Sequence, residues 1–351
     1  MRSNLSRRKI LQCSAAVLPA ARGAAAALRQ EGPNTPKLCM IASPNADDSA
    51  MRRITQLGVT HVLMGGPKIP WEEADLRAIK DRFKAAGITV ANMMIVGFPN
   101  AIYGRPGKDE DIEKVQKSIR AAGKARLPVV EYNFYAHRLV EGYFEEPGRA
   151  GSGMLSFDYD KVKDLPPLPG EGAHSLDEMW KNVTYFLKAV IPVAKESNVR
   201  MALHPNDPPP PISRGSGQIM GTLEGWKRLV GIVPSPHNGI TFDCGVTREL
   251  GEDPVAVCRY FGQKECINHM HFRNVRMREP REKYTEVFPD EGEVDMFAVM
   301  KELVRQKYSW LIYPEHPRGL DADKERKDNY SGWVFNVAYA RAMLQAALAS
   351  Q

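Results

Sequence analysis

The sequence has only five cysteines in 351 residues, and none of them form a CxxC pair. A disulfide framework is therefore not implied. No apolar run reaches the roughly 20 residues of a membrane span, and no basic patch with interleaved aromatic residues indicates nucleic-acid binding. No GxGxxG motif follows any expected strand, so the usual signature of a dinucleotide-binding fold is absent. With 43% hydrophobic and 26% charged residues, the composition is that of a globular protein with a sizeable core.

The net charge of +6 originates in the first thirty residues, because six arginines and lysines precede Glu31, the first acidic residue. This segment contains SRRKILQ (residues 6–12) and then the weakly apolar CSAAVLPAARGAAAAL. The pattern resembles a twin-arginine export signal, and the alternative is an ordinary basic tail. We expect residues 1–30 to be this signal, read by the twin-arginine machinery. Residues 31–351 would then be one catalytic domain, exported folded to the periplasm or the cell exterior without a membrane anchor in the mature form.

After residue 36 the chain alternates short apolar runs, typical of strands, with longer amphipathic stretches, typical of helices. The expected strands are residues 37–42, 61–66, 89–96, 129–134, 199–205, 239–245, 267–275 and 310–316. Eight such units predict an α/β fold of the (β/α)8 TIM-barrel type, with insertions after strands 4 and 5 at residues 136–174 and 206–221. An open doubly wound sheet is the main alternative.

Ionisable side chains lie at the expected ends of strands four to eight. They are Glu131, His204, Asp243, Cys244, His269, His271, Glu315 and His316. A closed barrel places these strand ends side by side at one rim. Singly, each residue has a structural explanation, such as a hydrogen-bonded histidine or a salt-bridged glutamate. Together, two imidazoles and two carboxylates predict a site for a divalent metal, with Mn²⁺ favoured by the oxygen-rich set and Fe²⁺, Co²⁺ or Zn²⁺ as alternatives.

His269 and His271 are two residues apart on the same expected strand, so both point to the same face of the sheet. We therefore expect one of them to lie behind the metal ligands instead of among them. The proline run at 208–211, four residues after His204, is expected to hold a rigid loop over the site.

Several segments resemble, in order, the signatures of the mannonate dehydratase family. They are VVEYNFYAH, GSGMLSFDYD, ALHPNDPPPPI, NGITFDCG, HFRNV, DEGEVDM and YPEH, and the resemblance runs from about residue 50 to the C-terminus. It implies a metal-dependent TIM barrel related to the xylose-isomerase-like enzymes. The family's metal ligands are the histidine of HPxDPP, a cysteine in strand six, the histidine before RNV and an acid ending strand eight. These positions correspond to His204, Asp243, His271 and Glu315.

The sequence departs from the family pattern at this site. Asp243 stands where the family has its cysteine, and Cys244 follows it. Neighbouring strand residues point to opposite faces, so only one can be a ligand, and we favour Asp243. Glu131 also differs from the family residue and resembles the isomerase and epimerase relatives, and Glu315 stands where the family has an aspartate. The family has an arginine-containing segment where this sequence has the run SRGSGQIM. One substrate contact, that of the family's arginine, is therefore expected to be missing.

The resemblance implies removal of water from a sugar acid, by abstraction of the proton α to the carboxylate and loss of the β-hydroxyl, with the metal stabilising the enolate-like charge. Asp207 and His316 are the candidates for the general base and the general acid, without a role assigned to each, and Tyr330 is expected to close over the site. Arg273, Asn274 and Asn133 are expected to bind the substrate.

Two other functional classes stay open at this point, and so does assembly into a homo-oligomer. An exported metal-dependent sugar isomerase, epimerase or keto-glycoside lyase is the alternative that the export signal favours, and a sugar-binding protein without chemistry is the second. A positively charged side chain directed at the metal site would favour the dehydratase, because only an acidic substrate needs a counter-charge.

Overall fold

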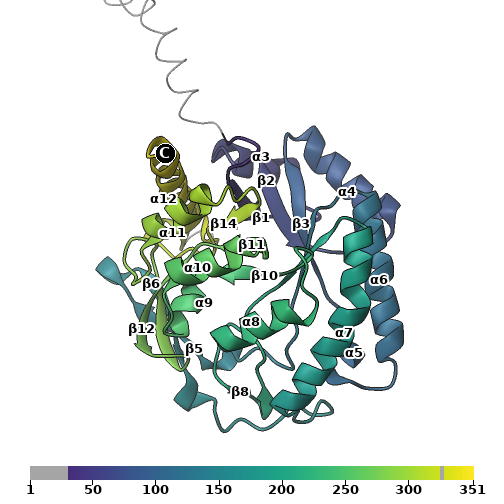
Figure 1. Ribbon diagram of the computed structural model, residues 1–351. Coiled ribbons are helices and arrows are strands. Elements are labelled where there is room, and N and C mark those ends of the chain that lie inside the picture. Colours follow the sequence, from purple (N-terminus) through teal and green to yellow (C-terminus); the bar gives the residue numbers. More distant parts are fainter. Residues whose placement is uncertain (1–30, 325–327) are drawn as a thin grey trace, which may run out of the picture.

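Eight parallel strands close into a barrel in which β14 pairs with β1 and completes the ring (Figure 1). The strands are, in spatial order, β1 (Lys37–Ile41), β2 (His61–Gly65), β3 (Thr89–Ile95), β4 (Val129–Tyr132), β7 (Arg200–Leu203), β10 (Asn238–Asp243), β11 (Ile267–His271) and β14 (Leu311–Tyr313). This computed structural model describes residues 31–324 and 328–351. The predicted TIM barrel is confirmed, whereas the predicted export signal lies outside the described residues.

Helices surround the barrel, with α4, α6 and α7 on one side and α10, α11 and α12 on the other (Figure 1). The helices are α3 (Asp48–Gln56), α4 (Glu73–Ala85), α5 (Pro99–Tyr103), α6 (Lys108–Lys124), α7 (Leu176–Glu196), α8 (Leu223–Ile232), α9 (Cys244–Glu249), α10 (Pro254–Gln263), α11 (Met296–Arg305) and α12 (Tyr330–Ala349). Within the described ranges, none of these helices combines the length and the hydropathy of a membrane-spanning segment.

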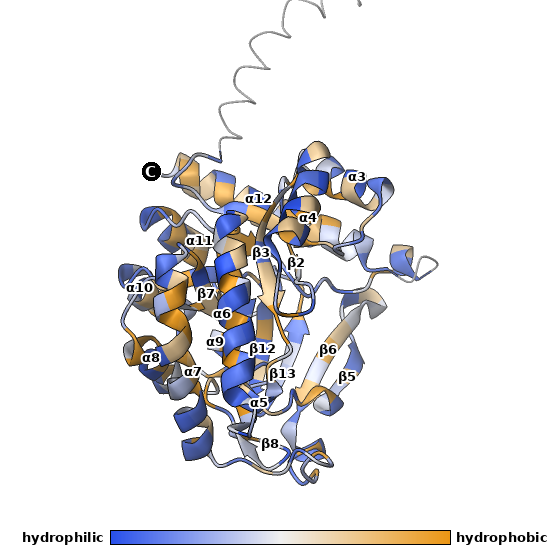
Figure 2. Ribbon diagram, turned by 90° about the vertical axis from the view of Figure 1, so that its right-hand side faces the viewer, coloured by the Kyte–Doolittle hydropathy of each residue, from blue (hydrophilic) through white to orange (hydrophobic). Residues whose placement is uncertain are grey.

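Local sequence explains where the helices begin. The Ser175 hydroxyl accepts a hydrogen bond from the Glu178 amide (3.2 Å), and the Glu178 carboxylate accepts one from the Ser175 amide (2.7 Å). This capping box stabilises the start of α7 by about 1 kcal/mol. Hydrophilic residues line the outward side of α6 (Figure 2), while Ile112, Val115 and Ile119 are buried on its other side, as the amphipathic pattern predicts.

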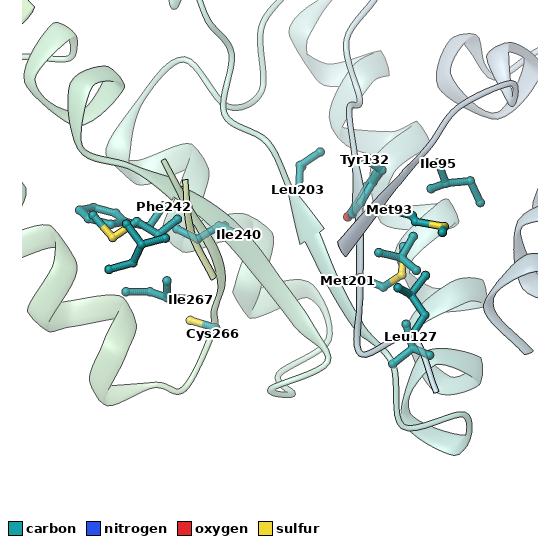
Figure 3. Packing of buried hydrophobic residues seen from close by; sticks show 14 of the residues in the cluster. Met93, Ile95, Leu127, Tyr132, Met201, Leu203, Ile240, Phe242, Cys266 and Ile267 are labelled. Atoms are coloured by element: carbon teal, nitrogen blue, oxygen red, sulfur yellow. The ribbon is translucent and has the colours of Figure 1, made fainter. Parts of the chain in front are cut away.

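The main apolar core lies between the barrel strands and the helices. Met201 and Leu203 of β7 and Ile240 and Phe242 of β10 are all fully buried in it (Figure 3). These residues alternate along their strands with residues that face the barrel interior, since side chains of a strand point to opposite faces in turn. The interior is therefore free to carry polar groups while the outer face holds the helices.

The insertions form a second, four-stranded antiparallel sheet beside the barrel, in the order β12-β13-β6-β5. Its strands are β5 (Tyr143–Pro147), β6 (Gly153–Asp158), β12 (Asn274–Glu279) and β13 (Lys283–Val287), and a small hairpin joins β8 (Ile212–Ser213) to β9 (Ser216–Gly217). We call the four-stranded sheet the accessory sheet. The insertions after strands 4 and 5 are confirmed, and a third one after strand 7 was missed.

The prediction of a single strand at residues 267–275 is wrong. The barrel strand β11 ends at His271, and β12 begins at Asn274 in the accessory sheet. Residues on both sides of the break have strand-forming character, so local pattern alone does not show that the chain changes sheets. The small apolar core of the accessory sheet includes Phe157, Val275 and Tyr284.

Candidate metal centre and active site

Five polar side chains meet inside the barrel at the carboxyl ends of its strands. Glu131 lies on β4, His204 directly follows β7, Asp243 and His271 end β10 and β11, and Glu315 follows β14. We call these five residues the barrel cluster. His204 is half-buried and the others are buried. The structure therefore brings together the four predicted metal ligands.

The donor atoms of the predicted ligands converge around one nitrogen of His271. His271 Nδ1 lies 3.2 Å from His204 Nε2 and 2.9 Å from Glu315 Oε1. It also lies 3.7 Å from Asp243 Oδ2. Nitrogen and oxygen donors so close together, from four neighbouring strands, are typical of a divalent metal centre.

Polar neighbours orient the two ligand histidines. His204 Nδ1 lies 2.7 Å from the Pro205 carbonyl, which turns Nε2 toward the donors. The other nitrogen of His271, Nε2, lies 3.6 Å from Glu131 Oε1. Glu131 is itself fixed by hydrogen bonds from Asn92 (2.9 Å) and Thr241 (2.8 Å). A carboxylate behind a ligating imidazole sets its tautomer and raises its basicity, and Glu131 lies on the Nε2 side of His271. A carboxylate oxygen of Glu131 also lies within 4.8 Å of ligand atoms of His204 and His271, so the geometry allows it to bind metal as well.

His269 lies deeper in the barrel than the ligands. Its Nε2 is 4.0 Å from Glu131 Oε2, and neither ring nitrogen has a hydrogen-bond partner among the described residues. Burial lowers the pKa of His269 to about 4, despite the opposing effect of Glu131. A neutral histidine behind the ligands agrees with the expectation that only one of the strand-seven histidines faces the donors.

Cys244 is not directed at the donors. It begins α9, and its thiol donates to the carbonyls of His271 (3.4 Å) and Arg273 (3.2 Å). Burial, together with Asp243, raises its pKa above the ordinary value, which opposes formation of the thiolate that a metal needs. Asp243 instead has one oxygen, Oδ2, on the side of His271, and this arrangement favours it as the ligand.

A second group of polar residues lies beside the barrel cluster. Asp207 follows β7, Glu286 lies on β13 of the accessory sheet, and His316 follows β14. One ligand atom from each lies within 4.8 Å of the other two. We call these three residues the insertion cluster. Two further arginines hold it, since Arg138 contacts Asp207 (3.0 Å) and Arg318 contacts Glu286 (2.9 Å).

His316 is held in a fixed orientation at the open side of the insertion cluster. Its Nδ1 lies 2.8 Å from Glu286 Oε2 and its Nε2 3.4 Å from Glu315 Oε2. Its φ of +50° is rare for a residue other than glycine, and Arg318 Nε donates to its carbonyl (2.9 Å). Burial lowers the pKa of His316, but Glu286 and Glu315 outweigh it and raise the pKa above its ordinary value. With 26% of its side chain exposed, His316 is placed for the predicted proton transfer.

Asp207 is poorly suited to the predicted role of general base. Its Oδ1 accepts hydrogen bonds from Tyr143 (2.9 Å) and Tyr284 (3.2 Å), and its Oδ2 accepts one from Arg138 (3.0 Å). Although burial raises its pKa, Arg273 and Arg138 lower it well below the ordinary value. A carboxylate held ionised by so many donors has little tendency to take a proton, and its contacts are those of an anchor.

Arg273 does not have the contacts of the predicted substrate-binding residue. Only 2% of its side chain is exposed. Its Nε lies 2.9 Å from Asp243 Oδ2 and 3.3 Å from Glu315 Oε1, and its Nη1 lies 2.7 Å from Glu249 Oε1. Its Nη2 lies 3.5 Å from Asp207 Oδ1. The guanidinium therefore bridges the two clusters and neutralises protein carboxylates.

The remaining predicted residues have other surroundings. The Asn274 side chain donates to the carbonyls of Pro289 (2.9 Å) and Val294 (3.2 Å), so it fixes a loop instead of meeting substrate. The Tyr330 hydroxyl donates to the Arg53 carbonyl (3.2 Å), and the structure does not bring it to either cluster. Asn133 is half-buried near the end of β4, with its amide nitrogen 3.8 Å from Met94 Sδ.

Sequence reasoning missed Arg138, Glu286 and Arg318. All three lie in loops or in the accessory sheet, where no strand end marks a functional position. The available signals were weak. Arg138 lies six residues past the end of β4, and Arg318 lies two residues past the predicted strand 310–316. Glu286 is near a predicted strand end only in space.

A divalent metal fits the charges of these residues. Five buried carboxylates have a pKa below the ordinary value, although burial raises it, because histidine or arginine neighbours outweigh burial: Glu131, Asp207, Asp243, Glu286 and Glu315. The buried guanidiniums that face them belong to Arg273 and Arg318. Glu315 Oε1 lies 2.9 Å from His271 Nδ1 and 3.3 Å from Arg273 Nε, but neither contact is a hydrogen bond of good geometry. A cation between the donors would give that buried oxygen a further partner.

Comparison with known proteins agrees with the resemblance found in the sequence. The family model described as D-mannonate dehydratase (UxuA) matches residues 42–168 and 173–350. A mannonate dehydratase of Streptococcus equi subsp. zooepidemicus is 31% identical over 286 residues, which cover 74% of this chain and 78% of that protein. One from Thermotoga maritima is 31% identical over 294 residues, covering 73% and 80%.

Solved structures show the same fold. The crystal structure of mannonate dehydratase from Streptococcus suis matches with a TM-score of 0.82 at 26% identity, covering 90% of this chain and 95% of that one. An L-ribulose 3-epimerase matches with a TM-score of 0.57 at 14% identity, covering 90% and 97%, and shows the shared fold alone. From the family match over most of its length and the relatives above 30% identity, the chain belongs to the D-mannonate dehydratase family.

Proposed function

We propose that the protein is a metal-dependent hydro-lyase that dehydrates D-mannonate or a closely related sugar acid to a 2-keto-3-deoxy acid. The observation that carries this proposal is the convergence of His204, Asp243, His271 and Glu315 within the barrel cluster. His316 lies beside them on the open side. The related proteins that are named mannonate dehydratases support the choice of substrate. Sugar isomerases and epimerases share only the fold with this chain, so we do not favour that alternative.

We propose His204, Asp243, His271 and Glu315 as the metal ligands and Mn²⁺ as the metal, since two of these four residues are carboxylates and oxygen donors favour this ion. When bound, the cation supplies Lewis-acid stabilisation of the negative charge that develops on the substrate carboxylate. Glu131 orients His271 from behind, and Arg273 favours the ionised form of Asp243 and contacts both Asp243 and Glu315.

His316 is the residue that we assign to proton transfer at the departing hydroxyl. Glu286 and Glu315 raise its pKa in opposition to burial, which favours the protonated imidazole that an acid requires. Its Nδ1 lies 2.8 Å from Glu286 Oε2, and its Nε2 lies on the side of the proposed metal ligand Glu315 (3.4 Å to Oε2), which is where we place the substrate. A positioned acid of this kind contributes about 10²- to 10⁴-fold to a reaction rate.

The test is elemental analysis of the purified protein, coupled to D-mannonate turnover before and after chelation. We expect bound Mn²⁺ in stoichiometric amount and release of a 2-keto-3-deoxy acid that stops with chelator and returns with Mn²⁺. The variant His316→Asn should retain the metal and lose most turnover. His237→Asn is the matched control, because His237 precedes β10 at the opposite end of the barrel and bonds the Val199 carbonyl (2.8 Å). Metal-loaded protein without turnover of any sugar acid would contradict the proposal.

We also propose that residues 1–30 direct export by the twin-arginine route, supported by the SRRKILQ motif. Replacing Arg7 and Arg8 with lysine should retain the protein in the cytoplasm of a host with this route. Unchanged export of the variant would contradict the assignment.

A further inference from the structure

Three arginines contact the carboxylates of the two clusters, and they differ in exposure. Arg273 exposes 2% of its side chain and Arg318 exposes 8%. Arg138 exposes 41%. A substrate can therefore reach Arg138 without displacing an existing ion pair, whereas the other two guanidiniums are enclosed by protein carboxylates.

Arg138 is held along one edge only. Its Nε donates to the Asp207 carbonyl (2.7 Å) and its Nη2 donates to Asp207 Oδ2 (3.0 Å). Its third nitrogen, Nη1, makes no hydrogen bond with a described residue. Nη1 is also not one of the buried polar atoms that lack a partner, so it is not enclosed by protein. Asp207 is itself fixed by the hydroxyls of Tyr143 and Tyr284. The guanidinium is thus oriented before any ligand arrives.

Arg138 lies at the same rim as the reacting groups. Asp207, its anchor, offers an oxygen within 4.8 Å of a ring nitrogen of His316. Burial lowers the pKa of Arg138, but Asp207, the tyrosines 143 and 135, and Glu315 raise it above its ordinary value. Through Asp207, which contacts it at 3.0 Å, Arg138 is therefore linked to the insertion cluster that contains His316.

We propose that Arg138 binds the carboxylate of the sugar acid through the exposed edge of its guanidinium, with Asp207 as the residue that positions it. A planar guanidinium matches a carboxylate in shape and charge. Arg138 would therefore select acidic sugars over neutral ones at this site. This inference rests on the proposed function. It gives Arg138 the role of binding the substrate carboxylate, which the buried Arg273 cannot fill.

The experiment compares D-mannonate with D-mannitol, a neutral sugar alcohol, as ligands of the Mn²⁺-loaded full chain. Calorimetry is run on wild type, Arg138→Gln, Arg138→Lys and Arg149→Gln. Arg149 is the matched control, because it also exposes 41% of its side chain and pairs with Asp290 (2.7 Å) on the surface. We expect Arg138→Gln to weaken D-mannonate binding about tenfold or more, as for loss of a charged hydrogen bond, and to leave D-mannitol unaffected. Arg149→Gln should change neither.

Equal D-mannonate affinity in wild type and Arg138→Gln would overturn the inference. Equal weakening of both ligands, or a loss of Mn²⁺ affinity by electron paramagnetic resonance, would also overturn it, because Arg138 would then be structural. If Arg138→Gln fails to fold, Arg138→Lys decides by the same criteria, with a smaller expected loss. Binding of D-mannonate that depends on Arg138 without release of product would contradict the proposed reaction and leave this inference standing. Turnover of D-mannonate with an unchanged KM in the Arg138 variants would contradict this inference and leave the proposed reaction standing.

Discussion

The barrel cluster and the insertion cluster lie side by side but are built differently. Every member of the barrel cluster lies within two residues of the end of a barrel strand. The members of the insertion cluster come from the loop after β7, from β13 and from the loop after β14. The first group is therefore placed by the rigid hydrogen-bonded barrel, and the second by loops and by the accessory sheet.

This difference suggests a division of tasks. Metal binding needs several donors at fixed separations, which parallel strands provide. Proton transfer and substrate recognition need groups on the open side of the metal, which loops provide. We expect substitutions in the barrel cluster to remove the metal, and substitutions in the insertion cluster to slow the reaction while the metal stays.

The largest effect is expected at Asp243. Asp243→Asn removes the charge that pairs with Arg273 (2.9 Å) and one proposed metal ligand. We expect Mn²⁺ affinity to fall about 100-fold or more, turnover to fall to background, and the unfolding free energy to fall by about 3 kcal/mol through the broken buried ion pair. Manganese titration by electron paramagnetic resonance and thermal unfolding measure both effects.

Cys244→Ala, at the neighbouring position, is the matched control for Asp243→Asn. The thiol points away from the donors, toward the carbonyls of His271 and Arg273. Metal affinity should stay within about twofold of wild type, because no donor to the metal is removed. If Cys244→Ala loses the metal and Asp243→Asn retains it, the assignment of the strand-six ligand is wrong.

A smaller and different effect is expected at Glu286. Glu286→Gln keeps the size of the side chain but removes the carboxylate that lies 2.8 Å from His316 Nδ1. We expect kcat to fall about 10²-fold through loss of the orientation and charge of His316, with Mn²⁺ affinity near that of wild type. Glu279→Gln, on an exposed position of β12 in the same sheet, should leave both unchanged. Loss of the metal in Glu286→Gln would remove the proposed division between the two clusters.

The same difference explains what the sequence could predict. The eight βα units and the rim positions of His204, Asp243, His271 and Glu315 were predictable, because hydrophobic pattern marks strands and strand ends mark the rim. The choice of these four among the rim residues as predicted metal ligands came from the resemblance to the family. Glu286 was not, because it lies within a strand of a sheet whose existence the pattern does not reveal. Asp207 and Arg273 were recognised as polar residues of the site, but their roles depend on partners from several elements.

Arg273 shows this limit most clearly. The motif HFRNV marks a positive charge near the metal, and a positive charge near a metal suggests a contact with an acidic substrate. Its actual partners are Asp243, Glu315, Glu249 and Asp207, which come from β10, α9 and two loops. Only the folded chain shows that they enclose it.

Because Arg273 contacts both clusters, a small disturbance of it should affect both at once. Gly245 offers such a disturbance: a Cβ there would lie 2.8 Å from Arg273 Cγ and 2.9 Å from its Cζ. We expect Gly245→Ala to cost about 1–3 kcal/mol of stability through overpacking. Mn²⁺ affinity and kcat should each fall severalfold, less than in the variants above, since the guanidinium is shifted and not removed.

Gly231→Ala, in helix α8, is the matched control for that substitution. A Cβ at Gly231 would meet no atom within 4 Å, so the change should stabilise the helix by about 0.5–1 kcal/mol and leave metal binding and turnover unchanged. Thermal unfolding, manganese titration and steady-state kinetics on both variants decide the outcome. If Gly245→Ala lowers metal affinity without affecting kcat, or the reverse, then Arg273 does not couple the clusters, and each is stabilised by its own partners.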